Sequence, residues 1–100
     1  MPHPAQGFIE ALHEREATPR LHVNLECDGA VAPDFVIERW GQELVIDLDP
    51  SYPLNLAFTE LGVEADLSFG GYVTRCVFPW DAIYFVGDRE TGRGLAFEQN

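Results

Sequence analysis

Histidine side chains are the first candidates for chemistry in this chain, because imidazoles bind metals and transfer protons. The three histidines are His3, His13 and His22, and no two of them form an HxH or HxxxH pair. A zinc site needs three or four convergent ligands, usually supplied by such local pairs. The spacing therefore favours packed or solvated imidazoles and predicts no metal site, with His3 in a frayed terminus.

Carboxylates and hydroxyls are the second group of candidates. Asp47 and Asp49 are expected on one face of a strand, and Asp66 at a polar-facing strand position. Acid–base catalysis by such a pair requires that one carboxyl be buried with a raised pKa. Ser51 and Ser68 lie outside any GxSxG motif, so no nucleophile, base and orienting group assemble. The sequence predicts a protein without catalytic residues or cofactors, and an enzyme that uses Asp47 or Asp66 stays as an alternative.

The two cysteines, Cys27 and Cys76, stand far apart in the chain and have apolar neighbours. Such thiols are typical of free, buried cysteines in a cytosolic protein. Neither a leader of charged and then apolar residues nor an apolar run of membrane-spanning length is seen. We therefore expect free thiols and a cytoplasmic location.

The charge of the chain restricts its partners. The formal net charge is −11, and all six cations are arginine. This excess of acid repels nucleic-acid phosphates and anionic membrane surfaces. A length of 100 residues with 46% hydrophobic side chains suits one domain, residues 1–100. We expect partners other than nucleic acid or membrane.

One helix is expected to precede the strands, over about residues 4–17. Phe8, Ile9 and Leu12 follow one another at three- and four-residue spacing and form an apolar face. This face either lies on the core of its own subunit or packs against its copy in a dimer.

The rest of the chain, about residues 20–98, has the alternation and turn signals of short strands. The predicted strands are residues 21–27, 31–37, 44–48, 63–69 and 72–78, with shorter apolar pieces at 54–58, 83–86 and 95–97. Gly70-Gly71 marks a tight reversal between two of them. The predicted fold is mainly β with one N-terminal α-helix, as a small, strongly bent sheet or barrel.

Two segments could receive an extended peptide beside this sheet, Ser51–Leu56 and Asp66–Gly71. Gly70 would permit close backbone approach, and the Asn55 amide could hydrogen-bond a peptide unit. The alternative is that the apolar residues of both segments belong to the core and that the glycines only form a hairpin turn.

Short motifs recur in order along nearly the whole chain. They are FIEAL at 8–12, TPxLxV at 18–23, Gly29, Pro33, GQ at 41–42, LVIDL at 44–48, NL at 55–56, SFGG at 68–71, VFPWDAI at 77–83, RExGxG at 89–94 and FE at 97–98. The ordered set resembles the stringent starvation protein B (SspB) family, whose members bring tagged substrates to the ClpXP protease.

The resemblance implies a small, Sm-like, partly open β-barrel and a homodimer, with Phe8, Ile9 and Leu12 contributing to the subunit contact. It also implies a non-enzymatic adaptor that binds ssrA-type degradation tags in a groove. Relatives contact the ClpX unfoldase through an acidic tail that continues beyond this domain. This member is expected either to use such a tail, or to dock differently or not at all. An Sm-like nucleic-acid-binding module is the alternative function, and the net charge argues against it.

The family's groove maps onto two segments of this sequence. The implied peptide-binding residues are Tyr52, Pro53, Leu54, Asn55, Asp66, Ser68, Phe69 and Gly70. Ser68 stands where relatives carry an arginine, and Ser51–Pro53 is bulkier than the small-residue connection of relatives. Because these groove residues differ, we expect the tag that this chain binds to differ from the tags that relatives bind.

Overall fold

Two antiparallel sheets and an N-terminal helix form the computed structural model, which describes residues 3–98. The elements, in chain order, are α1 (Pro4–Glu14), β1 (Pro19–Val23), α2 (Asp34–Trp40), the 3-10 turn η1 (Gly41–Glu43), β2 (Leu44–Asp47), β3 (Ala57–Phe58), β4 (Gly62–Phe69), β5 (Tyr72–Pro79), the 3-10 turn η2 (Trp80–Ala82), β6 (Ile83–Asp88) and β7 (Gly94–Ala96).

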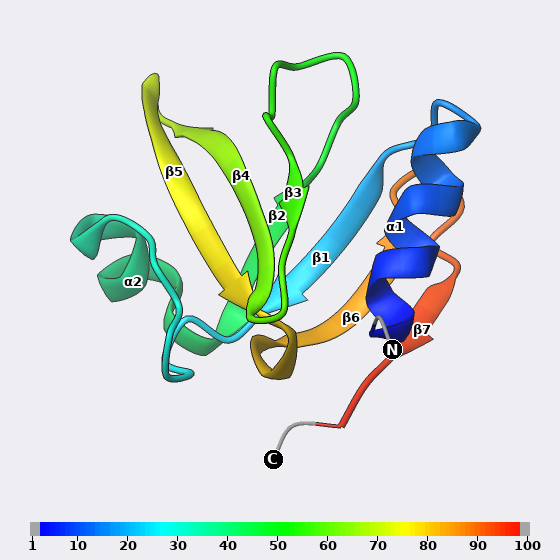
Figure 1. The fold of residues 1–100 in the computed structure, drawn as a ribbon. Coiled ribbons are helices and arrows are strands. Elements are labelled where there is room, and N and C mark those ends of the chain that lie inside the picture. Colours follow the sequence, from blue (N-terminus) through cyan, green and yellow to red (C-terminus); the bar gives the residue numbers. More distant parts are fainter. Residues whose placement is uncertain (1–2, 99–100) are drawn as a thin grey trace.

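The strands are ordered β2-β1-β6-β7 in one sheet and β3-β4-β5 in the other. The chain passes from β5 through η2 into β6, so this corner joins the two sheets (Figure 1). The β4–β5 hairpin rises on one side and β1 with β6 on the other, while α1 lies beside β6 and β7 (Figure 1). The sheets do not close into a full barrel, which confirms the predicted, partly open barrel with an N-terminal helix.

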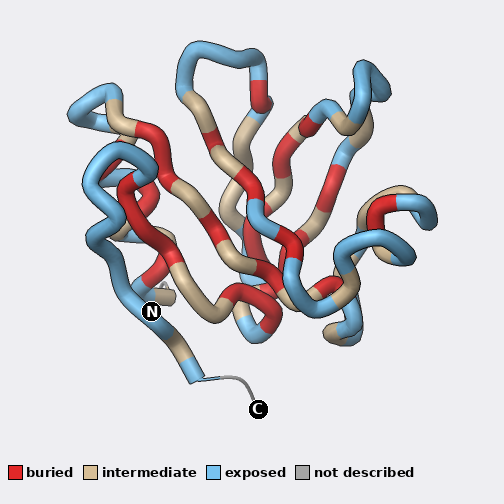
Figure 2. The backbone as a smooth tube through the Cα atoms, turned by 180° about the vertical axis from the view of Figure 1, so that it is seen from behind, coloured by how far each residue is buried: buried red, intermediate tan, exposed pale blue. Residues whose placement is uncertain are grey.

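Buried residues alternate with less buried ones along the strands (Figure 2). The buried hydrophobic side chains form one core to which both sheets and α1 contribute. In β1, Leu21 and Val23 face inward and His22 between them does not, as period two requires. The predicted strand over residues 21–27 ends early, at Val23, because a turn follows. There the Asn24 side chain accepts the N–H of Glu26 at 2.9 Å.

The Gly70-Gly71 reversal forms as predicted. Phe69 pairs with Tyr72, and both glycines have positive φ, 60° and 87°. A two-residue hairpin turn in which both φ values are positive matches the twist of the flanking strands, and glycine adopts it without steric cost. The turn thus fixes the register of the whole β4–β5 pair.

Helix α1 is shorter than the predicted span to residue 17. It ends at Glu14, and Glu16 takes a left-handed φ of 57°. At the other end, the prediction of a frayed His3 is wrong. The His3 ring accepts the N–H of Ala5 at 3.0 Å and stacks on Trp80 at 5.2 Å between centroids. This cap satisfies an otherwise unpaired helix donor.

The prediction of a strand over residues 31–37 is also wrong, and α1 is therefore not the only helix. Val31 forms one isolated bridge with Val77, and the chain then enters α2 at Asp34. Pro33 immediately precedes the helix, where its missing N–H costs nothing, and Asp34 supplies a favourable charge in the first turn. Within residues 3–98, neither helix is long and apolar enough to cross a membrane.

Candidate functional site

A groove of about 570 Å³ lies between β2, the segment after it, and the upper parts of β4 and β5. Its lining residues are Trp40, Leu44, Val45, Ile46, Asp47, Tyr52, Pro53, Leu54, Asp66, Leu67, Ser68, Phe69 and Val73. Six of the eight predicted peptide-binding residues therefore lie together in one concave site. Asn55 and Gly70 are not among the lining residues.

One wall of the groove comes from the segment after β2. Tyr52 and Pro53 are exposed there, whereas Leu54 is buried beneath them. The opposite wall includes Trp40 at the end of α2, whose ring lies 6.5 Å from that of Phe69. Sequence reading missed Trp40 because it treated the preceding residues as a strand, although Pro33-Asp34 is a helix-start signal.

The edge of β2 supplies main-chain groups to this region. β2 is the outermost strand of its sheet, and Leu48 beyond it donates its N–H to the Pro19 carbonyl at 2.8 Å. In an antiparallel register, alternate residues face the partner strand. Val45 and Asp47 therefore direct their N–H and C=O groups away from β1. An extended peptide can pair with such an edge.

A polar clamp formed by Asn55, Asp66 and Arg75 fixes the Tyr52–Leu54 wall. Asn55 donates its side-chain N–H to Asp66 Oδ2 at 2.8 Å, and its own carbonyl accepts from Arg75 Nη1 at 2.7 Å. Arg75 Nη1 also lies 3.1 Å from Asp66 Oδ1. The Asp66 N–H donates to the Leu54 carbonyl at 2.7 Å.

The clamp gives Asn55 a structural role in addition to its predicted contact with a peptide. Its backbone adopts a left-handed φ of 47°, which asparagine tolerates better than most residues. One N–H of its side-chain amide is bonded to Asp66 within the subunit, so Asn55 helps to hold the wall in place. The hydrogen bond from Asn55, and then that from Arg75, hold the pKa of Asp66 below its usual value. Asp66 is therefore ionised at neutral pH.

Gly70 has a structural role in the hairpin, and its contact with a bound peptide stays a prediction. It lies at the hairpin tip, and a Cβ at this position would meet no heavy atom within 4 Å. The turn itself requires glycine there, because the φ of this position is positive.

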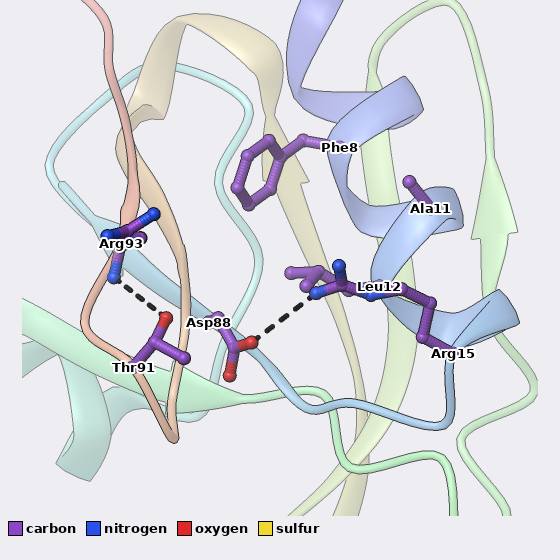
Figure 3. Close-up of a pocket in the computed structure, with 7 residues that line it drawn as sticks. All are labelled: Phe8, Ala11, Leu12, Arg15, Asp88, Thr91 and Arg93. Atoms are coloured by element: carbon purple, nitrogen blue, oxygen red, sulfur yellow. Dashed lines mark hydrogen bonds and ion pairs between the residues drawn. The ribbon is translucent and has the colours of Figure 1, made fainter.

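A second hollow, of about 660 Å³, lies between α1 and the β6–β7 turn. Figure 3 shows Phe8 and Ala11 on α1, and Arg15 directly after the helix, on one side of it, with Asp88 and Arg93 on the other. Arg15 and Asp88 form an ion pair at 3.6 Å (Figure 3). The side of α1 that borders this hollow is not covered by other elements of the described structure.

The predicted dimer face of α1 divides into two parts. Ile9 has 0% and Leu12 has 4% relative exposure, so both pack into the core of their own subunit. Phe8 is partly buried against the core and also lines the hollow. Of the three predicted residues, Phe8 retains the most surface for a second subunit.

Comparison with known protein families matches residues 3–100 to SspB, stringent starvation protein B. The chain belongs to the SspB family. The match covers both the groove and the α1 face, so both are parts of one SspB domain. A search of curated proteins found no match. SspB is a family of non-enzymatic adaptors, and membership supports an adaptor-type role for this chain.

The remaining carboxylates of this SspB domain have structural partners. Arg20 holds Asp47 through two bonds, from Nε to Oδ1 at 2.7 Å and from Nη2 to Oδ2 at 3.0 Å. Asp49 accepts the N–H and O–H of Ser51 at 2.9 and 2.7 Å, which lowers the pKa of Asp49. A general acid at neutral pH needs a raised pKa. The pKa of Asp49 is shifted in the opposite direction, and the Asp47 carboxylate is held by both of its bonds to Arg20.

The thiols and imidazoles likewise occupy packed positions. Burial raises the pKa of Cys76 to about 11, and Cys27 is also free, as predicted. A thiol with a raised pKa is a poor nucleophile. His13 Nε2 lies 2.7 Å from the Leu48 carbonyl, and His22 packs edge-on against Phe85. Within residues 3–98, no three histidine, cysteine or acidic side chains gather as metal ligands.

Proposed function

We propose that this SspB domain binds an ssrA-type degradation tag in the groove between β2 and β4. The observation that carries the proposal is the coincidence of a free strand edge with an apolar cleft. Val45 and Asp47 offer main-chain hydrogen bonds along one side, and Tyr52 and Phe69 offer side-chain surface on the other. Main-chain pairing supplies affinity and pockets supply specificity when a sheet edge captures a peptide.

The bound substrate would then be delivered to the ClpXP protease in the cytoplasm. Delivery needs no chemistry at the groove, because tethering a substrate beside the unfoldase raises its effective concentration. Contact with ClpX would come through a tail beyond this domain, as the family resemblance implies. The proposed role is thus binding and presentation without catalysis.

Nucleic-acid binding, the alternative for an Sm-like fold, has little support from the charges. Arg15, Arg20, Arg75 and Arg89 each have a carboxylate within ion-pair distance. Among the described residues, those that line the groove include two aspartates and no arginine or histidine. Binding to a phosphate backbone depends on unneutralised cations.

Titration calorimetry with the organism's own tag peptide tests the proposal. We expect a dissociation constant near about 1 μM, or about −8 kcal/mol, and weaker binding by Phe69→Ala, which removes part of the groove wall. A scrambled tag of equal composition is the control. Absence of binding by the native domain, or equal binding of both peptides, would refute the adaptor role at this groove.

The proposal includes a homodimer in which α1 of each subunit contacts the other. Phe8 and the exposed Ala11 lie at the hollow beside Arg15, and the outer face of α1 carries Glu10 and Glu14. In a dimer, Glu10 and Glu14 of one subunit would lie toward Arg15 of the other. Opposite charges across the contact favour association of the subunits.

We expect Ala11→Arg and Phe8→Ala to shift the domain from dimer to monomer in sedimentation equilibrium. Ala11→Arg adds bulk and positive charge to an exposed position, and so should leave the fold intact. Phe35→Ala, an equally conservative loss of an exposed aromatic residue on α2, should leave the dimer unchanged. A monomeric native domain, or a dimer broken by Phe35→Ala instead, would contradict this contact.

A further inference from the structure

The Tyr52–Leu54 wall of the groove is attached to the rest of the domain at its two ends. At the end after Leu54, the polar clamp fixes it to β4 and β5. In between, the Tyr52 N–H donates to the Asp49 carbonyl and the Leu54 N–H donates to the Tyr52 carbonyl, so these bonds stay inside the segment. The position of the wall therefore depends on how well each end is held.

The other end of the wall begins at Leu48, which is bonded to two different elements. His13, in the last turn of α1, lies with Nε2 at 2.7 Å from the Leu48 carbonyl oxygen. A carbonyl oxygen only accepts, so Nε2 carries the proton and donates. The Leu48 N–H in turn donates to the carbonyl of Pro19, the first residue of β1, at 2.8 Å. Both main-chain groups of Leu48 thus have partners outside the segment.

Asp49 adds a weaker attachment next to Leu48. Its Oδ2 lies 3.7 Å from Arg89 Nη1, and its Oδ1 accepts both bonds from Ser51. The bonds from Ser51, and then the nearby Arg89 and His13, hold the pKa of Asp49 below its usual value. The carboxylate is therefore ionised at neutral pH in the turn that leads to Tyr52.

Of the two side chains that reach this end from outside, His13 makes the stronger contact. Arg89 is 36% exposed in its side chain, and an ion pair of that kind contributes little. Leu48 is fully buried, so its carbonyl would lose its donor without gaining water if the imidazole were removed. An unpaired buried carbonyl is costly, and the chain can relieve that cost by moving. Loss of the imidazole should therefore release this end of the wall.

We infer that His13 is a positioning residue for the groove, which holds the Leu48 end of the Tyr52–Leu54 wall against α1. The inference rests on the proposed function and deepens it by naming a residue on which tag binding depends. Among the described residues, those that line the groove do not include His13, so its effect passes through the wall. A wall that is already fixed spares the ligand the entropy cost of ordering it.

Native-state amide hydrogen exchange at Ser51, Tyr52 and Leu54 tests the inference, because these N–H groups report local opening of the segment. His13→Leu removes the donor but keeps a strong helix former in α1. We expect it to speed exchange at the three amides and to weaken binding of the organism's own tag in calorimetry. Each effect should be about fivefold, the factor that corresponds to one hydrogen bond.

His13→Gln is the conservative variant, since glutamine also favours a helix and its side-chain N–H can replace Nε2–H. It should keep exchange and tag affinity within about twofold of the native values. Should His13→Leu fail to fold, His13→Asn makes the same comparison with a shorter amide.

Ile83→Val is the control for lost stability alone. Ile83 is 1% exposed in β6, so this change lowers the midpoint of urea denaturation. It should leave exchange at the three amides unchanged. Equal acceleration by Ile83→Val and His13→Leu would reduce the effect to general stability and overturn the inference.

The remaining outcomes separate this inference from the proposed function. If the native domain binds the tag but His13→Leu changes neither exchange nor affinity, the positioning role fails and the adaptor function stands. Faster exchange with unchanged affinity, or no recovery in His13→Gln, also refutes the positioning role. If exchange responds as expected but the native domain binds no tag, His13 still holds the wall and the degradation-tag function fails.

Discussion

Tyr52→Ala is expected to weaken tag binding by about thirtyfold, equivalent to about 2 kcal/mol, because it removes a large aromatic contact from the groove wall. The Tyr52 side chain is available to a ligand, since the residue is 66% exposed. Its backbone is held independently: the Tyr52 N–H donates to Asp49 and its carbonyl accepts from Leu54. The substitution therefore removes the contact without loosening the wall, and calorimetry with the organism's tag measures the loss.

Tyr72→Ala is the matched control for this prediction. Tyr72 is 58% exposed, close to the value for Tyr52, but it lies past the hairpin tip and packs against Phe35 outside the groove. Its removal should change the dissociation constant by less than about twofold, the scale of most surface substitutions. A larger effect from Tyr72 than from Tyr52 would place the tag on the α2 side of the hairpin and exclude the groove.

Local signals in the sequence were sufficient for most of the strands of the two sheets. Two adjacent glycines determine the β4–β5 register by themselves, because both positions need positive φ. The alternation of Leu21, His22 and Val23 likewise reports their burial directly. Turns that depend on local backbone conformation, and strands whose buried residues alternate with exposed ones, could thus be predicted.

The sequence was less informative about α2, where local signals conflict. Val36 and Ile37 are β-branched and favour a strand, yet Pro33 and Asp34 start a helix. Packing decides between the two, since Val36 is fully buried on one side of α2 while Phe35 stays exposed. Because the helix was missed, the position of Trp40 in the groove could not be predicted.

The clamp behind the Tyr52–Leu54 wall could not be predicted for a different reason. Asn55, Asp66 and Arg75 are separated by 11 and 9 residues, and they meet only because β4 pairs with β5 in the observed register. Nothing in the separate segments identifies which carboxylate Asn55 will reach. The resemblance to SspB placed Asn55 at the site, and the structure adds a role in supporting the wall.

Gly62→Ala is expected to destabilise the domain by about 3 kcal/mol or more, because the new methyl group overlaps backbone that cannot move aside. A Cβ at Gly62 would lie 2.0 Å from the Phe78 carbonyl oxygen and 2.6 Å from Pro79 Cα. β4 and β5 approach closely at this point, just before the chain turns into η2. Urea denaturation should show the loss as a lower transition midpoint.

Gly7→Ala in α1 is the matched control, since the same methyl group is added where no heavy atom lies within 4 Å. Glycine inside a helix costs about 0.5–1 kcal/mol relative to alanine, so this variant should be slightly more stable than the native domain. If Gly62→Ala lowers the free energy of unfolding and Gly7→Ala raises it, the close approach at Gly62 is the cause of the loss. The replacement of a glycine as such would then not be the cause. If Gly62→Ala were as stable as the native domain, the contact between β4 and β5 at Phe78 would have to be looser than described.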